Sequence, residues 1–385
     1  MLSYRKLAMR VLGRPLHTGG GGIYSPRPAS QRAAAFILTA AMLTTLAAPA
    51  FAGTWYIEDG NITISAGTEA GTNKVEQAGK DTVDNDKDTI ITNQNKDTAS
   101  SNTVTIDAGS DKVEVTLQDV NIKADSGSAL TSKGDVTLTL KGDNHLTGGI
   151  SGTGNYGRNG IASTGSLTIS GGENDSLTAQ GGSGADGSYG GHGIYSNGSL
   201  TISGGTVNAT GGDGSNVNGS GISSNGSVTI SGGTVNATGG NGSHGGNGIY
   251  SRSSLTISGG TVNATGGSGE DGGDGIRSFD PVAISGGTVT ANGGNSTNSS
   301  GGYGISSLDV AISGGTVTAN GGDSKDGYGG DGIHSNDIDL SGSLELTAKA
   351  GSPNGKALSQ NGRELDLDAI KDKLGPGAKV TATDA

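Results

Sequence analysis

The sequence predicts an all-β protein that folds as a parallel β-helix, with three short strands in each turn of the coil. Three observations support this prediction. Glycine supplies 76 of the 385 residues and aromatic residues only 3%, so a compact core of large side chains is excluded. A phrase that begins at Ser199, SLTISGGTVNATGG, returns with small changes every 27 or 28 residues. Within each phrase, apolar and polar residues alternate with period two, which is a strand signal.

Each repeat contains three alternating segments, Ile-x-Ser, Leu/Val-x-Ile and Val-x-Ala, separated by glycine-rich corners. The anchors of the second segment are Ile169, Ile202, Ile230, Ile257, Ile284, Ile312 and Leu340. A sandwich of hairpins gives no reason for the same residue to return at the same place in every repeat. A three-sided coil does, because equivalent residues then stack about 4.8 Å apart. Its narrow interior also explains why Ile, Val, Ala and Ser take the place of aromatic residues.

The first part of the chain is typical of a secretory signal peptide. Residues 1–52 hold six basic residues and no acidic residue. They include the apolar stretch Ala33–Leu46 and end in an A-x-A sequence at Ala50 to Ala52, which resembles a cleavage site. We therefore expect the protein to be secreted or to lie at the cell surface, with no membrane-spanning segment in the mature chain.

Three further segments are predicted after the signal peptide. Residues 53–125 form an N-terminal cap and the first irregular rungs, and residues 126–350 form the regular repeats. Residues 351–385 form the last turn and a C-terminal cap, with a short helix at Asp368–Leu374. Atypical terminal units are expected because a solenoid must protect its open ends.

Composition excludes several classes of function. The chain has no cysteine, which rules out disulfides, thiolate metal sites and cysteine nucleophiles. The net charge is −12, and it becomes −18 without residues 1–52, which carry six of the 24 basic residues and none of the 36 acidic ones. Such a charge argues against nucleic acid as a partner. It leaves room for calcium, which binds oxygen ligands.

The corners between the third segment and the next Ile-x-Ser segment are acidic and rich in glycine. Carboxylates supply oxygen ligands, and glycine allows backbone carbonyls to converge on a cation. The candidate calcium ligands are Asp186, Asp213, Glu270, Asp271, Asp274, Asp323, Asp326 and Asp331. A second interpretation stays open, in which these acids lie in flexible, solvated turns and keep the protein soluble.

The outward side of the third segment is a candidate surface for binding polysaccharide. If its Val and Ala residues point inward, period two places Thr and Asn outward. The lattice consists of Thr206, Asn208, Thr210, Thr234, Asn236, Thr238, Thr261, Asn263 and Thr265, and similar Thr and Asn residues continue it in later repeats. On another face, Tyr195 and Tyr250 offer rings on which sugars can stack. The alternative is a soluble β-surface in which Thr serves strand propensity and Asn forms ladders.

Catalysis has less support in the sequence. Basic residues within the repeats are few, although Arg252 and Arg277 belong to adjacent rungs and can lie near one another. The histidines His145, His192, His244 and His334 have no metal-ligand spacing. We therefore expect a protein that is not an enzyme.

Residues Val113–Gly149 carry a resemblance to a known family. The strand pair V-x-L-x-x-V-N-I, the sequence Ser128-Ala129-Leu130 and the following V-x-L-x-L with N-x-L-T-G-G resemble the calcium-binding β-helix carbohydrate-binding domains secreted by anaerobic bacteria. The glycine-rich rungs from Gly160 to Gly322 are also similar to that family. The resemblance implies a right-handed β-helix of the pectate-lyase type. It also implies non-catalytic binding of acidic or cellulosic polysaccharide, with calcium in the loops.

Three rival functions remain open. The protein can be a structural or adhesin-like surface rod without sugar specificity, a polysaccharide lyase, or an ice-binding solenoid that uses its threonine ladders. In the leading interpretation, it acts as a monomer whose partner is polysaccharide.

Overall fold

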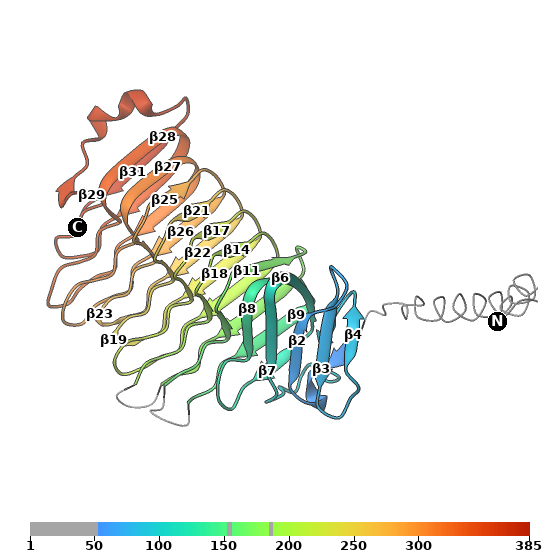
Figure 1. Cartoon of the computed structure of the whole chain (residues 1–385). Coiled ribbons are helices and arrows are strands. Elements are labelled where there is room, and N and C mark those ends of the chain that lie inside the picture. Colours follow the sequence, from blue (N-terminus) through green and yellow to red (C-terminus); the bar gives the residue numbers. More distant parts are fainter. Residues whose placement is uncertain (1–52, 152–155, 185–187) are drawn as a thin grey trace, which may run out of the picture. The chain divides into compact units, whose positions relative to one another are not determined.

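The computed structural model describes residues 53–151, 156–184 and 188–385. The predicted signal peptide lies outside these described residues. Within them, the chain coils into stacked turns (Figure 1), and 29 strands join one continuous hydrogen-bonded sheet. Equivalent strands in successive turns pair in parallel, so the predicted parallel β-helix is confirmed. No helix in the described ranges is long and apolar enough to cross a membrane.

The first turns are irregular. Strand β2 (Ile62–Ala66) pairs antiparallel with β3 (Asn73–Gln77), and β3 pairs antiparallel with β4 (Val83–Asp86). Strand β2 also pairs in parallel with β6, so this small meander is continuous with the coil. The other elements here are β1 (Thr54–Tyr56), the 3-10 turn η1 (Ile57–Asp59), β5 (Ile90–Thr92), β6 (Val104–Gln118), β7 (Asn121–Lys123), β8 (Leu130–Lys141) and β9 (Asp143–Thr147).

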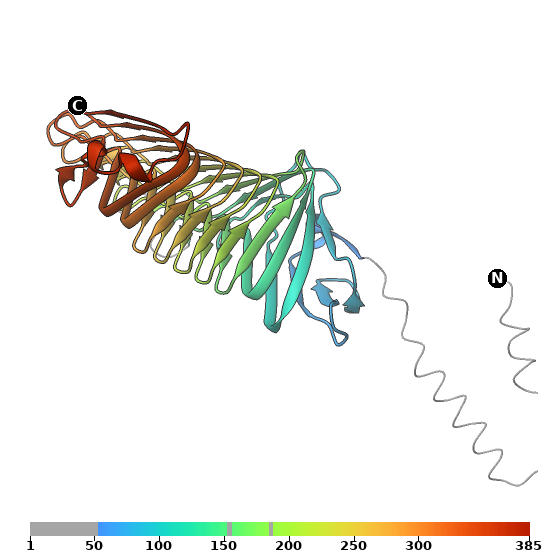
Figure 2. The ribbon, with the colours of Figure 1, turned by 90° about the horizontal axis from the view of Figure 1, so that it is seen from above.

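The regular turns form three columns of strands, which Figure 2 shows from above. The first column holds the Ile-x-Ser segments: β10 (Ile161–Ser163), β13 (Ile194–Ser196), β16 (Ile222–Ser224), β20 (Ile249–Ser251) and β24 (Ile276–Ser278). The second column holds β11 (Leu167–Gly171), β14 (Leu200–Ile202), β17 (Val228–Ile230), β21 (Leu255–Ile257) and β25 (Val282–Ile284). The third column holds β12 (Ser176–Gln180), β15 (Thr206–Thr210), β18 (Thr234–Thr238), β22 (Thr261–Thr265) and β26 (Thr288–Asn292).

The last turns contain longer strands. Strands β27 (Ile305–Asn320) and β28 (Ile333–Lys349) each run through all three columns. They are followed by β29 (Leu358–Gln360), β30 (Arg363–Glu364), η2 (Leu367–Ala369), η3 (Lys371–Lys373) and β31 (Lys379–Thr383). The helix predicted at Asp368–Leu374 is thus reduced to two single 3-10 turns.

Identical residues stack in register in the regular turns. Ile202 lies on Ile230, and Ile230 lies on Ile257; all three side chains are fully buried. The serine that ends each first-column strand is buried as well. The hydroxyl of Ser196 donates to the carbonyl oxygens of Gly165 and Gly198, both at 3.0 Å. The interior of the regular turns therefore holds one polar row, and carbonyls of the corners satisfy its hydrogen bonds.

The Ser-Gly-Gly corner between the second and third columns needs glycine for its backbone conformation. Its second glycine has a positive φ, which is 76° at Gly233 and 79° at Gly260. L-residues with a Cβ rarely adopt this conformation. The corner can therefore repeat in turn after turn without strain only because glycine occupies it.

A row of glycines closes each turn between the third column and the next first column. We call it the glycine seam: Gly182, Gly191, Gly212, Gly219, Gly240, Gly246, Gly267, Gly273, Gly294, Gly302, Gly322 and Gly330. The N–H of each of these glycines after Gly182 donates to the carbonyl of the one before it, at 2.7 to 3.0 Å. Together they make one chain of hydrogen bonds along the coil.

Glycine is required in the seam by close approach of the backbone. A Cβ added at Gly219 would lie 1.8 Å from the carbonyl oxygen of Gly191, and one at Gly246 would lie 2.0 Å from that of Gly219. These contacts join successive turns. Within one loop, a Cβ added at Gly211 would lie 1.9 Å from the carbonyl oxygen of Gly219, so the two arms of the loop are in direct backbone contact as well. The acidic, glycine-rich corners of the sequence are closely packed at their base, and only their tips extend beyond the seam.

Asn144 replaces an aliphatic residue inside an early turn. It lies in register with Leu177 of the next turn and is fully buried. Its Oδ1 accepts a hydrogen bond from the N–H of Val120 at 3.0 Å, and its Nδ2 donates to the carbonyls of Lys141 and Ser176 at 3.1 and 3.0 Å. A single amide thus links three successive turns.

Candidate binding groove

The residues around each first-column strand form three rows on the surface of the coil. The entry row lies two residues before the Ile anchor, the strand row one residue after it, and the exit row three residues after it. The entry row is His192, Ser220, Asn247, Asp274, Tyr303 and Asp331; the strand row is Tyr195, Ser223, Tyr250, Arg277, Ser306 and His334; the exit row includes Asn197, Asn225, Arg252 and Phe279.

The three rows enclose a groove of about 440 Å³ over the turns from His192 to Phe279. Entry-row residues directly follow a seam glycine, so the seam fixes one wall of the groove. The strand row points outward, because the Ile and Ser on either side of it are buried. Strand pairing places Tyr195 next to Ser223 and Ser223 next to Tyr250. The two tyrosines are therefore two turns apart, about 10 Å along the axis.

Entry and strand rows interact within several turns, because only a Gly-Ile pair separates them in sequence. The rings of His192 and Tyr195 stack with centroids 5.7 Å apart. In a later turn, Arg277 Nη1 lies 3.5 Å from Asp274 Oδ2. The spacing x-Gly-Ile-y thus predicts which side chains meet, although nothing in the repeat itself says that they form a groove.

Entry-row side chains also hold the next turn in place. The N–H of Ser220 donates to His192 Nδ1 at 2.9 Å, and the N–H of Asp274 donates to Asn247 Oδ1 at 2.9 Å. Asp274 Oδ1 in turn accepts a hydrogen bond from the N–H of Tyr303 at 2.8 Å. This explains why hydrogen-bond acceptors recur at this position.

The electrostatics of the groove depend on two groups of the entry row, the half-buried His192 and the buried Asp274. Burial lowers the pKa of His192 to about 4. The imidazole is therefore neutral near pH 7, with its proton on Nε2, because Nδ1 accepts a hydrogen bond. Burial raises the pKa of Asp274 to about 6, against the opposing effect of Arg277 and of the Tyr303 N–H.

Two arginines make the groove basic within an acidic protein. Arg252 Nε donates to Tyr250 Oη at 3.4 Å, and the guanidinium carbon of Arg277 lies 5.6 Å from the centre of the Phe279 ring. Phe279 also packs edge-on against Tyr250, with ring centroids 5.7 Å apart. Their positions in adjacent rungs allowed the two arginines to lie near one another, and both line the groove.

Amide groups complete the tyrosine side of the groove. Asn225 Nδ2 donates to Tyr195 Oη at 2.9 Å and to Asn197 Oδ1 at 2.7 Å. The sequence analysis did not identify Asn225, His192 or Phe279 as site residues. Their common signal is a fixed offset from the Ile anchor.

The Thr and Asn lattice of the third column has the predicted alternation, with Val207 and Ala209 buried. Its amides are bonded to one another: Asn236 Nδ2 donates to Asn208 Oδ1, and Asn263 Nδ2 donates to Asn236 Oδ1, both at 2.8 Å. This ladder uses part of the hydrogen-bonding capacity that the lattice would offer to a ligand. Its role in binding polysaccharide stays a prediction.

The predicted calcium ligands do not come together. In the described ranges, no group of three or more acidic or histidine side chains is placed to hold a metal ion, and Asp186 lies outside those ranges. Asp274 pairs with Arg277, and Asp331 Oδ2 lies 2.7 Å from His334 Nδ1. These residues do not supply the six to eight oxygens that calcium takes. Calcium binding stays a prediction without a defined site.

Other predicted ligands hold neighbouring turns together. Asp213 Oδ1 accepts a hydrogen bond from the N–H of Asn241 at 2.7 Å, and Asp323 Oδ1 accepts one from the N–H of Ser352 at 2.8 Å. Asp271 lies beside His244, with Oδ2 2.6 Å from Nδ1. Glu270 and Asp326 are exposed.

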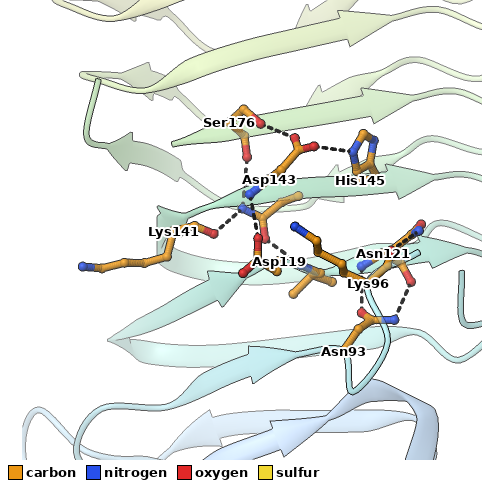
Figure 3. A network of polar contacts seen from close by, with 10 residues as sticks. Asn93, Lys96, Asp119, Asn121, Lys141, Asp143, His145 and Ser176 are labelled. Atoms are coloured by element: carbon orange, nitrogen blue, oxygen red, sulfur yellow. Dashed lines mark hydrogen bonds and ion pairs between the residues drawn. The ribbon is translucent and has the colours of Figure 1, made fainter. Parts of the chain in front are cut away.

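A polar network on the third column contains serine, aspartate and histidine (Figure 3). Asp143 lies between the other two: the Ser176 hydroxyl donates to Asp143 Oδ1, and His145 Nε2 is 3.0 Å from Asp143 Oδ2. The hydroxyl of Ser176, with a further contribution from His145, lowers the pKa of Asp143. In serine hydrolases the histidine lies between serine and aspartate, so this order does not activate Ser176.

A family model described as a beta helix repeat matches the chain over residues 200–226, 228–247, 255–276, 282–307 and 310–337. These are the regular turns that form most of the groove, and the match agrees with the fold. No curated protein matches the chain, and no solved structure matches it. The comparisons thus support a β-helix repeat protein, and they give no information about an activity.

Proposed function

We propose that the protein binds polysaccharide in the groove without cleaving it, and that acidic glycans are its preferred ligands. The observation that carries the proposal is the presence of two tyrosines and two arginines in one groove of a protein whose net charge is −12. In the leading interpretation it acts outside the cell, as the sequence of residues 1–52 predicts.

The tyrosines and the arginines of the groove have separate roles in this proposal. The rings of Tyr195 and Tyr250 offer apolar faces for the C–H side of sugar rings. The guanidinium groups of Arg252 and Arg277 bind carboxylate or sulfate groups in a planar, two-pronged geometry. Because the tyrosines follow one another along the coil axis, the glycan chain lies along this axis and crosses successive turns. Several weak contacts of this kind add up along one chain.

A structural rod is the second candidate. It is favoured by the asparagine ladder of the third column, whose amides satisfy one another from Asn208 to Asn263. In this case the Thr and Asn lattice stabilises the coil and has no ligand.

The proposal is tested by immobilising the protein and measuring how strongly it retains polygalacturonate. Retention of uncharged cellohexaose is measured for comparison. We expect Tyr250→Ala to weaken binding of both glycans about tenfold, since stacking contributes about 1 kcal/mol or more. Replacing Arg252 and Arg277 by Gln should weaken binding of polygalacturonate selectively.

The matched control changes the other face of the coil. Thr234→Ala combined with Thr261→Ala removes exposed hydroxyls from the third column and should leave retention unchanged. If this pair abolishes retention while Tyr250→Ala does not, the lattice is the binding face. Absence of retention by the wild-type protein would favour the structural rod.

A further inference from the structure

Asp274 is a buried carboxylate directly behind the basic wall of the groove. Its exposed fraction is 5%, although it is one of the most polar side chains in the chain. Oδ1 accepts the hydrogen bond from the Tyr303 N–H at 2.8 Å, and Oδ2 faces Arg277 Nη1 at 3.5 Å. Arg277 is half-exposed and lines the groove. One guanidinium thus lies between a buried anion and the surface where a ligand would bind.

The other charged groups around Asp274 come from neighbouring turns. Arg252 of the preceding turn lines the same groove. In the following turns, the ring of His334 stacks on Tyr303 with centroids 4.4 Å apart, and Asp331 is paired with His334 at 2.7 Å. Asp331 therefore has a histidine as its partner, whereas the partner of Asp274 is an arginine of the groove.

We propose that Asp274 is a proton-controlled counter-ion of Arg277, so that protonation of the carboxyl frees the guanidinium charge for an anionic ligand in the groove. The inference rests on the proposed function, because it assumes that the groove binds an acidic glycan. It adds a regulatory role for an entry-row residue that is buried behind the groove and is not among the residues that line it.

The direction of the pH effect follows from the two protonation states. With Asp274 ionised, its negative charge offsets the positive charge of Arg277, so the pair has no net charge to attract a ligand anion. With Asp274 protonated, the pair carries one positive charge. The raised pKa of Asp274, about 6, places the change in mildly acidic solution. Affinity for an anionic ligand therefore decreases as the pH rises through about 6.

The chain itself provides the variant that tests the mechanism. Asn247 occupies the same row one turn earlier, and its Oδ1 accepts the N–H of Asp274 at 2.9 Å. An Asn at position 274 can accept the Tyr303 N–H in the same way. Asp274→Asn thus removes the charge and keeps the hydrogen bond that holds the next turn.

The experiment measures binding of dextran sulfate, an anionic polysaccharide whose sulfate charges do not titrate, from pH 4.5 to 7.5. We expect the wild-type protein to bind about fivefold more tightly at pH 5 than at pH 7.5, an effect that corresponds to one charge acting near the surface. Asp274→Asn should bind at all these pH values as tightly as the wild-type protein does at pH 5. His334→Gln should keep the direction of the wild-type pH dependence and move its midpoint slightly upward, because Asp274 is still paired with Arg277 and has lost only the weaker effect of His334, which lowers its pKa.

A second measurement keeps the inference testable if the variant does not fold. Binding and proton uptake are reciprocal, so bound dextran sulfate should raise the pKa of Asp274, observed by carbon-13 NMR of its carboxyl group in the wild-type protein. A wild-type affinity that does not change with pH, or the same pH dependence in Asp274→Asn, would overturn the inference while leaving glycan binding intact. Failure to bind polygalacturonate or dextran sulfate at any pH would overturn the proposed function as well.

Discussion

The strand columns and the glycine seam both stack equivalent residues from turn to turn, but they use opposite chemistry. In the columns, aliphatic side chains such as Ile202, Ile230 and Ile257 fill the interior and exclude water. In the seam, side chains are absent, and backbone N–H and carbonyl groups bond directly from Gly219 to Gly240 and onward. One region depends on the size of its side chains and the other on their absence, so substitutions should affect them in opposite ways.

The largest expected effect is in the columns. Ile230→Asp places an unpaired carboxylate in the fully buried stack and should lower the free energy of unfolding by about 5 kcal/mol or more. Thr229→Asp, which changes the outward residue of the same strand, is the matched control and should cost less than about 1 kcal/mol. Urea unfolding monitored by circular dichroism measures both. Similar stability of the two variants would contradict the inward placement of Ile230.

In the seam, the smallest possible side chain should already be harmful. In Gly246→Ala, the new Cβ would lie 2.0 Å from the carbonyl oxygen of Gly219, so two turns must move apart at a cost of about 3 kcal/mol. The control is Gly172→Ala, whose Cβ would meet only the carboxylate end of the Asp175 side chain at 2.9 Å. This flexible side chain can move, so we expect a loss below about 1 kcal/mol. Equal melting temperatures for the two variants would show that the seam is not closely packed.

The smallest effect concerns the entry row, where the two regions meet. The folded protein holds a proton on Asp274 up to a pH of about 6, so this group stabilises the fold at low pH and loses that contribution as the pH rises from about 4 to 6. His192 has a pKa of about 4 in the folded protein and 6.5 as its ordinary value. Its contribution to the free energy of unfolding therefore increases as the pH rises from about 4 to 6.5.

Single variants should separate these two contributions. In Asp274→Asn, only the histidine remains, and stability should increase between pH 4 and 6. In His192→Asn, where Asn can still accept the N–H of the next turn, stability should decrease over that range. Each slope is at most about 1.4 kcal/mol per pH unit. Urea titrations at several pH values measure the slopes, and slopes of the same sign in both variants would contradict the assignment.

The sequence predicts the columns well because their signal is local. Period-two alternation identifies Ile230 and Val235 as inward-facing, and the constant repeat length predicts that they stack; both are buried in the structure. The seam is harder to predict, because a pair such as Gly239-Gly240 looks the same whether it is a flexible corner or a contact between two backbones. Only the three-dimensional approach of Gly219 and Gly246 distinguishes the two cases.

The candidate site shows the same limit. Tyr195 and Tyr250 were identified from their position after the Ile anchor, and they lie in the groove. Asp274 was grouped with Asp271 as a candidate calcium ligand because acidic residues cluster in the sequence there. In the structure, the Gly-Ile pair between Asp274 and Arg277 brings these two side chains together instead. Sequence clustering records neighbours along the chain, whereas the turn of the coil decides which residues meet.

The central claim is that the glycine-rich loops are closed at their base and hold the groove in place, and native-state amide hydrogen exchange tests it most directly. The N–H of Gly246 donates to the carbonyl of Gly240, and that of Gly273 to Gly267, both at 2.9 Å. We predict that these two amides exchange as slowly as that of Ile249 in the first column, because seam and column open together. Exchange of Gly246 and Gly273 as fast as at the exposed loop tip around Asp326 would contradict the account.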